Sequence, residues 1–142
     1  MTTSRAAMAA APGELRPTAI DENHLGRMTL GDRGLEREVL QLFLRQTAII
    51  LDRIMGAEPP MAAAAAHTLK GSARGIGAWR VARAAESLER AAGRPAREAG
   101  SGGDDPGDLE SAIAELKSAS LEAGAAIAAR LAVLLAELSA GR

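Results

Sequence analysis

Residues 60–92 read PMAAAAAHTLKGSARGIGAWRVARAAESLERAA, and this stretch decides the fold. Alanine is the best helix former, whereas strands favour β-branched and aromatic residues, so the composition predicts helix. Pro60 suits a first helical turn, and Gly75 and Gly77 interrupt the pattern that follows it. We therefore expect one helix over about 60–76 and a second over about 78–92.

The apolar spacing assigns a face to each of these helices. In the first helix, His67, Lys70, Gly71 and Arg74 are expected to point outward. Its inward side chains are expected to be Ala62, Ala65 or Ala66, Leu69, Ala73 and Ile76. In the second helix the expected inward positions are Val81, Ala85 and Leu88.

Upstream of this hairpin, two aspartates mark helix starts. Asp21 is expected to cap a short helix that runs through Met28, and Asp32 to cap a longer one that ends at Gly56–Pro60. The apolar residues of the longer helix predict a wide buried face, made of Leu35, Val39, Leu42, Phe43, Ile49, Ile50 and Ile54 and broadened by Leu40, Leu44 and Leu51.

Downstream, residues 93–107 are rich in glycine and are expected to form a flexible loop. A last helix is expected over about 108–138, with a bend or a break at Gly124. Its predicted buried residues are Leu109, Ile113, Leu116, Leu121, Ile127, Leu131, Leu134, Leu135 and Leu138.

Amphipathic helices joined by short connections predict an all-α fold. We expect an antiparallel four-helix bundle (up-down-up-down) with a short extra N-terminal helix. The bundle would occupy residues 18–140, with 93–107 as a loop within it. Residues 1–17 are small, polar and proline-containing, and are expected to be a disordered arm.

Composition excludes several functional classes. The 142 residues carry a net charge of −1, which argues against a general nucleic-acid binder. The chain has no cysteine, so it has neither disulfides nor thiolate metal ligands. No long uncharged apolar run suggests a membrane span, and the N-terminus lacks the apolar stretch of a secretory signal. We expect a cytoplasmic protein without membrane or nucleic-acid partners.

The outward patch of the first helix offers a specific chemistry. Residues three and four apart share a helix face, so His67, Lys70 and Gly71 lie together, with Arg74 one turn further on. The patch combines a nucleophilic imidazole, a positive charge and a gap without a side chain. Those features suit a histidine that carries a phosphoryl group. The residues alone also allow an ordinary surface histidine, and that is the more common situation.

The charge pattern around this patch favours a docking surface. No acidic residue lies between Glu58 and Glu86, whereas Lys70, Arg74, Arg80 and Arg83 all fall there. Lys70 is also one of only two lysines in a chain that otherwise uses arginine. A basic segment would complement an acidic pocket on a partner and speed encounter with it.

The segment His67-Thr68-Leu69-Lys70-Gly71-Ser72-Ala73, followed by Ile76-Gly77-Ala78, resembles the signature of histidine-containing phosphotransfer (HPt) domains. That signature reads roughly H-x-L-K-G-S-[AS]-x-x-[LIV]-G-A, and the apolar spacing continues to Leu88-Glu89. Upstream, Gly31-Asp32 with Leu35, Leu40, Phe43 and Leu44 is similar to the helix that precedes the histidine helix in that family. Together these matches cover about residues 20–89.

The resemblance implies that His67 accepts a phosphoryl group from a receiver-domain aspartate or a histidine kinase and passes it on to a response regulator. It implies that Lys70 steadies the phosphoryl group, that Gly71 admits the receiver, and that Ser72 orients or packs near the histidine. Gly71, Arg74 and Ser72 are the residues expected to dock the partner. It also implies a monomeric phosphocarrier rather than an enzyme. The Mg²⁺ of the reaction would belong to the receiver, so no cofactor or metal is expected on this chain.

Other interpretations stay open at this point. The chain could be a helical adaptor that binds and inhibits a kinase or receiver without phosphotransfer. A metal site is disfavoured because His24 and His67 are the only histidines and no carboxylate cluster accompanies either. No ATP-binding motif is present, which favours a stand-alone shuttle over a kinase fragment. His24 is expected to be a surface residue, and Trp79 either an interface anchor or a cap on the bundle end.

Overall fold

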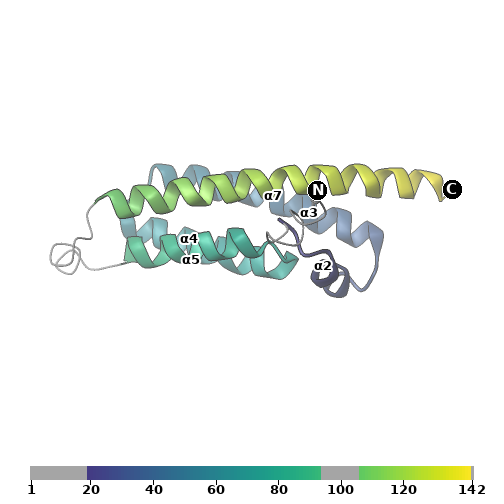
Figure 1. Cartoon of the computed structure of the whole chain (residues 1–142), viewed down its shortest axis with the longest axis horizontal. Helices are drawn as coiled ribbons and strands as arrows, with labels where there is room; N and C mark the ends of the chain where they lie inside the picture. The colour runs from purple at the N-terminus through teal and green to yellow at the C-terminus, as the bar shows by residue number, and fades with distance from the viewer. Residues whose placement is uncertain (1–18, 94–105, 142) are drawn as a thin grey trace, which may run out of the picture.

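The computed structural model describes residues 19–93 and 106–141, and the regular structure in this part of the chain is entirely helical. The helices are α2 (Glu22–Met28), α3 (Arg33–Met55), α4 (Pro59–Ile76), α5 (Trp79–Gly93) and α7 (Pro106–Ala140). Figure 1 shows the four longer helices lying side by side, with α2 against one end of the group. The all-α class predicted from the sequence is confirmed.

The ends of these helices follow from local side-chain chemistry. The Asp21 carboxylate accepts a hydrogen bond from the backbone N–H of His24, and the Asp32 carboxylate accepts one from Leu35, so both predicted N-caps are confirmed. Pro59 begins α4, where a missing N–H costs nothing. Gly77 ends α4 with φ of +82°, the left-handed conformation that glycine adopts most readily.

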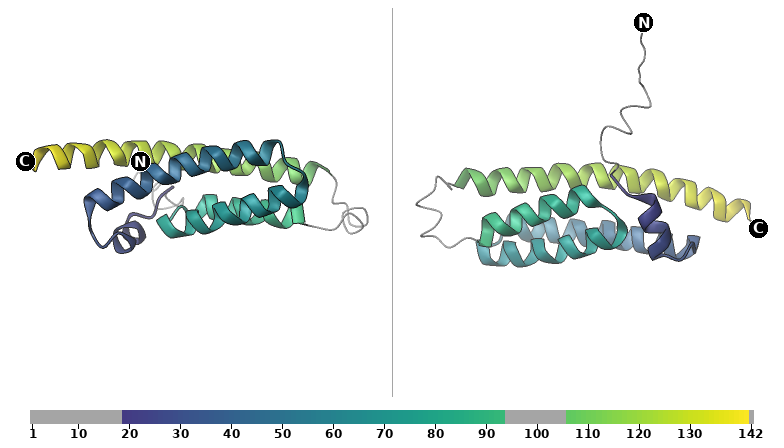
Figure 2. Two further views of the ribbon diagram at one scale, coloured as in Figure 1. Left: turned by 180° about the vertical axis from the view of Figure 1, so that it is seen from behind. Right: turned by 60° about the horizontal axis from the view of Figure 1, so that its bottom comes forward.

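The core lies between the four longer helices. α3 packs against α4 and α7, and α5 packs against the same two helices. The α4–α5 contact is the most extensive of these, and Figure 2 shows that hairpin lying alongside the other two helices. All the inward positions predicted for α4 and α5 are buried, namely Ala62, Ala65, Ala66, Leu69, Ala73, Ile76, Val81, Ala85 and Leu88.

The predicted buried faces of α3 and α7 were too wide. Leu35, Leu42 and Ile49 of α3 are exposed, and so are Leu121 and Leu135 of α7. A helix packed in a bundle buries one stripe, and here the stripe of α7 is filled partly by small residues that permit close helix approach. These are Ala112, Ala119 and Ala123, which are buried beside Leu116, Ile127 and Leu134.

The last helix begins earlier and is more continuous than predicted. α7 starts at Pro106 rather than near residue 108, and it passes through Gly124 without a break. A Cβ at Gly124 would lie 3.8 Å from Leu44 Cδ2, an ordinary packing distance, so glycine is not required there by α3. The arm predicted over 1–17 lies outside the described residues. So does the loop predicted over 93–107, except at its edges, where Gly93 ends α5 and Pro106 starts α7.

The composition of α7 bears on the expectation that the chain has no membrane span. Residues 108–140 are long and apolar enough to cross a membrane by length and composition, with a window of mean hydropathy 1.6. A helix that packs one face into a bundle passes the same test, so this property alone does not indicate a membrane protein. The hydropathy of α7 is high because it also carries exposed apolar side chains, Leu121, Val133 and Leu135.

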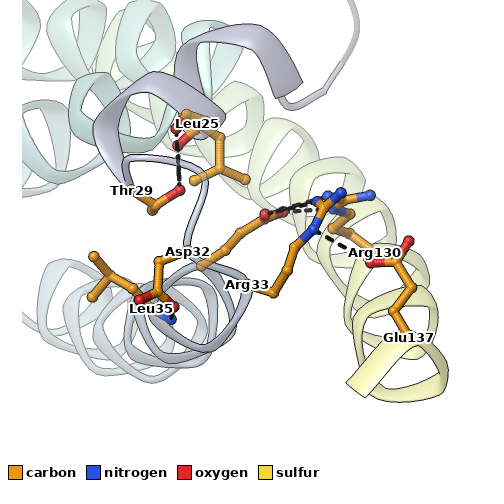
Figure 3. A network of polar contacts seen from close by, with 9 residues as sticks. Leu25, Thr29, Asp32, Arg33, Leu35, Arg130 and Glu137 are labelled. Carbon is orange, nitrogen blue, oxygen red and sulfur yellow. Dashed lines mark hydrogen bonds and ion pairs between the residues drawn. The ribbon is translucent and has the colours of Figure 1, made fainter. Parts of the chain in front are cut away.

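A buried ion pair joins α3 to α7 at the end of the bundle nearest α2. Glu36 is buried, and Arg130 holds its carboxylate with Nε 2.6 Å from Oε2 and Nη2 3.3 Å from Oε1. Arg33 lies 3.5 Å from the same carboxylate and 3.4 Å from Glu137. Figure 3 shows Arg33, Arg130 and Glu137 gathered there. This pair fixes the contact between α3 and α7, because separating it would leave a buried charge without a partner.

Candidate functional site

His67 lies in the middle of α4, on the open surface of the helix. Its side chain is 66% exposed, as the sequence predicted. Nδ1 lies 2.8 Å from Oε2 of Glu89 on the neighbouring helix α5. A carboxylate can only accept a hydrogen bond, so Nδ1 carries the proton and donates it. In the neutral ring, Nε2 is then the nitrogen with the free lone pair.

Glu89 also meets Lys70, whose Nζ lies 2.8 Å from the other carboxylate oxygen, Oε1. The hydrogen bond from Lys70 holds the pKa of Glu89 below its usual range, with a smaller contribution in the same direction from His67 and some opposition from burial. Glu89 is therefore ionised at neutral pH. Lys70 lies on the His67 side of α4, but its side chain is largely covered, at 14% exposed, rather than free in solvent.

Two glycines leave the surface beside His67 low. Gly71 is exposed, and a Cβ built at Gly71 or at Gly75 would meet nothing within 4 Å. The two residues lie four apart on one face of α4, and no contact with residues 19–93 or 106–141 demands glycine at either position. The open gap predicted at Gly71 is present, and Gly75 extends it by a turn.

The basic surface predicted around the histidine is smaller than the sequence suggested. Arg74 is exposed, but its guanidinium lies 4.0 Å from the Glu86 carboxylate on α5. Arg80 pairs with Glu122 of α7. Both arginines are thus paired with acidic residues from outside the acid-free segment 59–85. The acid-free run in α4 does not by itself make a basic face.

Ser72 points away from the histidine. Its hydroxyl donates to Oε1 of Gln46 on α3 at 3.1 Å, so it links two helices. The expectation that Ser72 orients or packs near His67 is not what the structure shows, because position 72 faces the α3 side of α4 while His67 faces α5. Ser72 and Gln46 instead fix the spacing of α3 and α4 beside the candidate site.

Glu89 is the residue of the candidate site that sequence reasoning missed. In the sequence, Glu89 is only the last residue of the match to the family signature, and no role was predicted for it. A usable signal was present: Glu86 and Glu89 lie three apart on α5, and Lys70 and Arg74 lie four apart on α4. In a helical hairpin, these two pairs of opposite charge can face each other.

His24 and Trp79 are joined to each other and to the turn between α4 and α5. Nε2 of His24 lies 2.9 Å from the carbonyl oxygen of Arg74, and the His24 and Trp79 ring centroids are 4.9 Å apart. Trp79 Nε1 donates to the Asp21 carboxylate at 3.0 Å. His24 is therefore a tertiary contact rather than the plain surface residue we expected. Trp79 lies at the bundle end, the second of the two positions considered for it.

No group of three or more His, Cys, Asp or Glu side chains in residues 19–93 and 106–141 is arranged to hold a metal ion. Around His67, Glu89 is the carboxylate in contact, and it is already shared between the imidazole and the lysine ammonium. The site thus consists of an exposed imidazole, hydrogen-bonded to Glu89, and the ion pair between Glu89 and Lys70.

Comparison with known proteins gives one clear result. The family model described as Hpt domain matches residues 38–141, which include α4, the His67–Glu89 pair and the whole of α7. Neither the curated proteins nor the solved structures contain a significant match to this chain. Because the family match spans well over half of the 142 residues, the chain belongs to the Hpt domain family.

Proposed function

We propose that this protein is a histidine phosphotransfer protein of a phosphorelay, in which His67 accepts a phosphoryl group from a receiver-domain aspartate or a histidine kinase and passes it to a response regulator. Membership of the Hpt family already implies phosphotransfer in two-component signalling, carried out by a phosphocarrier rather than an enzyme. One observation supports the assignment of His67 most strongly. Its Nδ1 is held by Glu89 while the ring is exposed at mid-helix.

The proposed step is an in-line displacement at phosphorus. The Nε2 lone pair forms the new N–P bond, the bond from phosphorus to the aspartyl oxygen breaks, and its electron pair returns to the receiver carboxylate. Positive charge develops on the imidazole as the bond forms. The Glu89 carboxylate, 2.8 Å from Nδ1, stabilises that charge and fixes the tautomer in which Nε2 attacks. In the second transfer, a carboxylate oxygen of another receiver's aspartate attacks phosphorus, the N–P bond breaks, and its electron pair returns to Nε2 of His67.

Lys70 is proposed to stabilise the transferring group. Its ammonium lies on the far oxygen of the carboxylate that holds His67, so a positive charge is close to the imidazole in the resting protein. The pair also keeps Glu89 ionised, because Lys70 is the main cause of its lowered pKa. Replacing Lys70 would therefore weaken both the phosphoryl contact and the orientation of the histidine.

The docking surface is proposed to extend from His67 over Gly71, Gly75 and Arg74 to α3. Gln46 of α3 accepts a hydrogen bond from Ser72 of α4. Leu42 and Ile49, four residues before Gln46 and three residues after it, are exposed. These two apolar side chains therefore lie beside the face that the glycines leave open. A receiver could bury them while its aspartate approaches His67.

The remaining properties follow as proposals. The helix contacts, α3 with α4, α4 with α5, α5 with α7 and α7 with α3, support an antiparallel up-down-up-down bundle with α2 as an added helix. The partners are response-regulator receiver domains and a sensor or hybrid histidine kinase, with Mg²⁺ on the receiver. We propose a cytoplasmic monomer that needs no cofactor, membrane or nucleic acid for transfer.

The test is phosphoryl transfer from a panel of receiver domains, each loaded in the presence of Mg²⁺, followed as acid-labile phosphate on the protein. We expect label on the wild type and none on His67→Gln. Equal label on His67→Gln would refute the site. Binding to a receiver or kinase without any label would favour the alternative, a non-phosphorylated adaptor that inhibits its partner.

A further inference from the structure

The second half of α4 is intrinsically weak as a helix. Gly71, Gly75 and Gly77 fall within seven residues, and glycine disfavours a helix interior more than any residue except proline. Only Gly77 is required by its backbone conformation, with φ of +82°. Gly71 and Gly75 lie within α4 and keep its surface low, so the open face weakens the helix that carries it.

Three residues hold this weak end from outside. The backbone N–H of Asp21 donates to the carbonyl of Gly77 at 2.9 Å, and the Asp21 carboxylate accepts from Trp79 Nε1. His24 on α2 reaches the carbonyl of Arg74 at 2.9 Å and lies against the Trp79 ring. We call Asp21, His24 and Trp79 the α2 clasp. It joins α2 to the last turn of α4 and the first turn of α5.

The clasp supplies a bond that the helix end lacks. The Arg74 carbonyl receives the backbone N–H of Gly77 only at 3.4 Å, whereas His24 Nε2 lies 2.9 Å away. A carbonyl can only accept, so Nε2 of His24 is the donor. A helix end depends on such partners because its last carbonyls have none within the helix.

The turn after α4 is shaped to receive α2. A Cβ at Gly77 would lie 3.0 Å from both Cβ and the carbonyl oxygen of Asp21, a contact so tight that Asp21 would have to shift. Glycine at position 77 therefore allows both the left-handed backbone conformation and the close approach of Asp21. The contact is part of the fold's construction, since any larger residue at 77 would push α2 away.

We propose that the α2 clasp is a positioning element of the docking face. By capping the Arg74 carbonyl and gripping the turn after it, the clasp keeps the last two turns of α4 helical despite their glycines. Gly71, Arg74 and Gly75 are thereby held in register with His67. The consequence for receiver docking rests on the proposed function, whereas the effect on α4 does not.

The first experiment measures amide hydrogen exchange in the wild type and in His24→Ala. Loss of one good hydrogen bond should speed exchange of residues 72–78 about fivefold, with little change in α3 or α7. His24→Gln, which retains a donor, should recover part of the protection. Ile54→Val trims a buried side chain in the last turn of α3, far along the chain from the clasp. It should not cause the local change.

A suppressor separates helix strength from other causes. A Cβ at position 75 meets nothing, and alanine favours helix, so Gly75→Ala added to His24→Ala should restore slow exchange in residues 72–78. Unchanged exchange in His24→Ala, or faster exchange spread evenly over all helices, would overturn the proposal.

The second experiment concerns the receiver. With a receiver that loads the wild type, His24→Ala should raise the receiver concentration for half-maximal rate about fivefold and leave the maximal rate unchanged. A lower maximal rate with unchanged half-saturation would contradict a positioning role. If the wild type takes no phosphoryl group, the proposed function fails, while the exchange result still tests the clasp.

Discussion

At the scale of single residues, the site depends on how one carboxylate is shared. Glu89 orients His67 with one oxygen and pairs with Lys70 through the other. An exposed histidine without such a partner would interchange its two neutral tautomers, and either nitrogen could attack. The carboxylate removes that ambiguity, so it is the feature that most favours the role proposed for His67 over that of an ordinary surface residue.

Glu89→Gln should slow phosphorylation of His67 without unfolding the protein. A neutral amide can still bond the ring but does not stabilise the developing positive charge, and the loss of a charge-assisted hydrogen bond corresponds to roughly a tenfold slower rate. The rate of labelling by phosphoramidate, a small phosphoryl donor, measures this without a partner. Glu86→Gln is the matched control and should label normally, because Glu86 pairs with Arg74 and Arg90 and not with His67 or Lys70. Equal slowing in both variants would argue against a specific role for Glu89.

Asp21 predicts how the fold responds to acid. The hydrogen bond from Trp79, followed by that from the His24 backbone, lowers the pKa of Asp21 below its ordinary value of 3.8. A lowered folded-state pKa contributes stability that is complete above the unfolded value and is lost as pH falls through the folded value. Asp21→Asn should therefore flatten the acid end of a plot of melting temperature against pH, from about pH 5 downward. An identical acid limb in the variant would contradict this.

At the scale of the helices, the sequence predicted starts and ends better than faces. Asp21, Asp32 and Gly77 act through local hydrogen bonds and backbone conformation, so their effects are visible in the sequence. The faces of α3 and α7 depend on which neighbour covers them. Leu42 and Leu121 fit a helical stripe as well as Leu40 and Leu116 do, and only the packing of the bundle distinguishes them. Glu89 was missed for the same reason, because its partners lie on another helix.

The register of α7 can be checked with two leucines five residues apart. Leu116 is fully buried and Leu121 is 77% exposed. Leu116→Ala should lower the free energy of unfolding by about 2–5 kcal/mol, because it removes core atoms and leaves a cavity. Leu121→Ala should change it by no more than about 0.5 kcal/mol. Urea denaturation followed by circular dichroism measures both, and similar losses in the two variants would show that the register is wrong.

At the scale of the whole molecule, α7 is the helix that closes the bundle. It packs on both α3 and α5, and the Glu36–Arg130 pair ties it to the start of α3. α4 and α5, which carry the site, are joined directly by a short turn. α3 packs against α4 and α7 packs against α5, and the α2 clasp holds the turn between α4 and α5.

Replacing one partner of the Glu36–Arg130 pair should lower the free energy of unfolding more than replacing both partners by apolar residues. Arg130→Met leaves the buried Glu36 carboxylate with only the more distant Arg33, and should lower the free energy of unfolding by about 3 kcal/mol. The double variant Glu36→Leu with Arg130→Met removes both charges and should recover much of that loss. A double-mutant cycle by chemical denaturation gives the coupling, and additive losses would show that the pair does not hold the two helices together.

The most direct measurement of the central claim is the position of the phosphoryl group after labelling with phosphoramidate, read by peptide mapping and by phosphorus and nitrogen NMR. We predict phosphate on Nε2 of His67 and none on His24, the only other histidine, whose Nε2 is bonded to the Arg74 carbonyl. Phosphate on Nδ1 of His67, on His24, or on neither histidine would contradict the account.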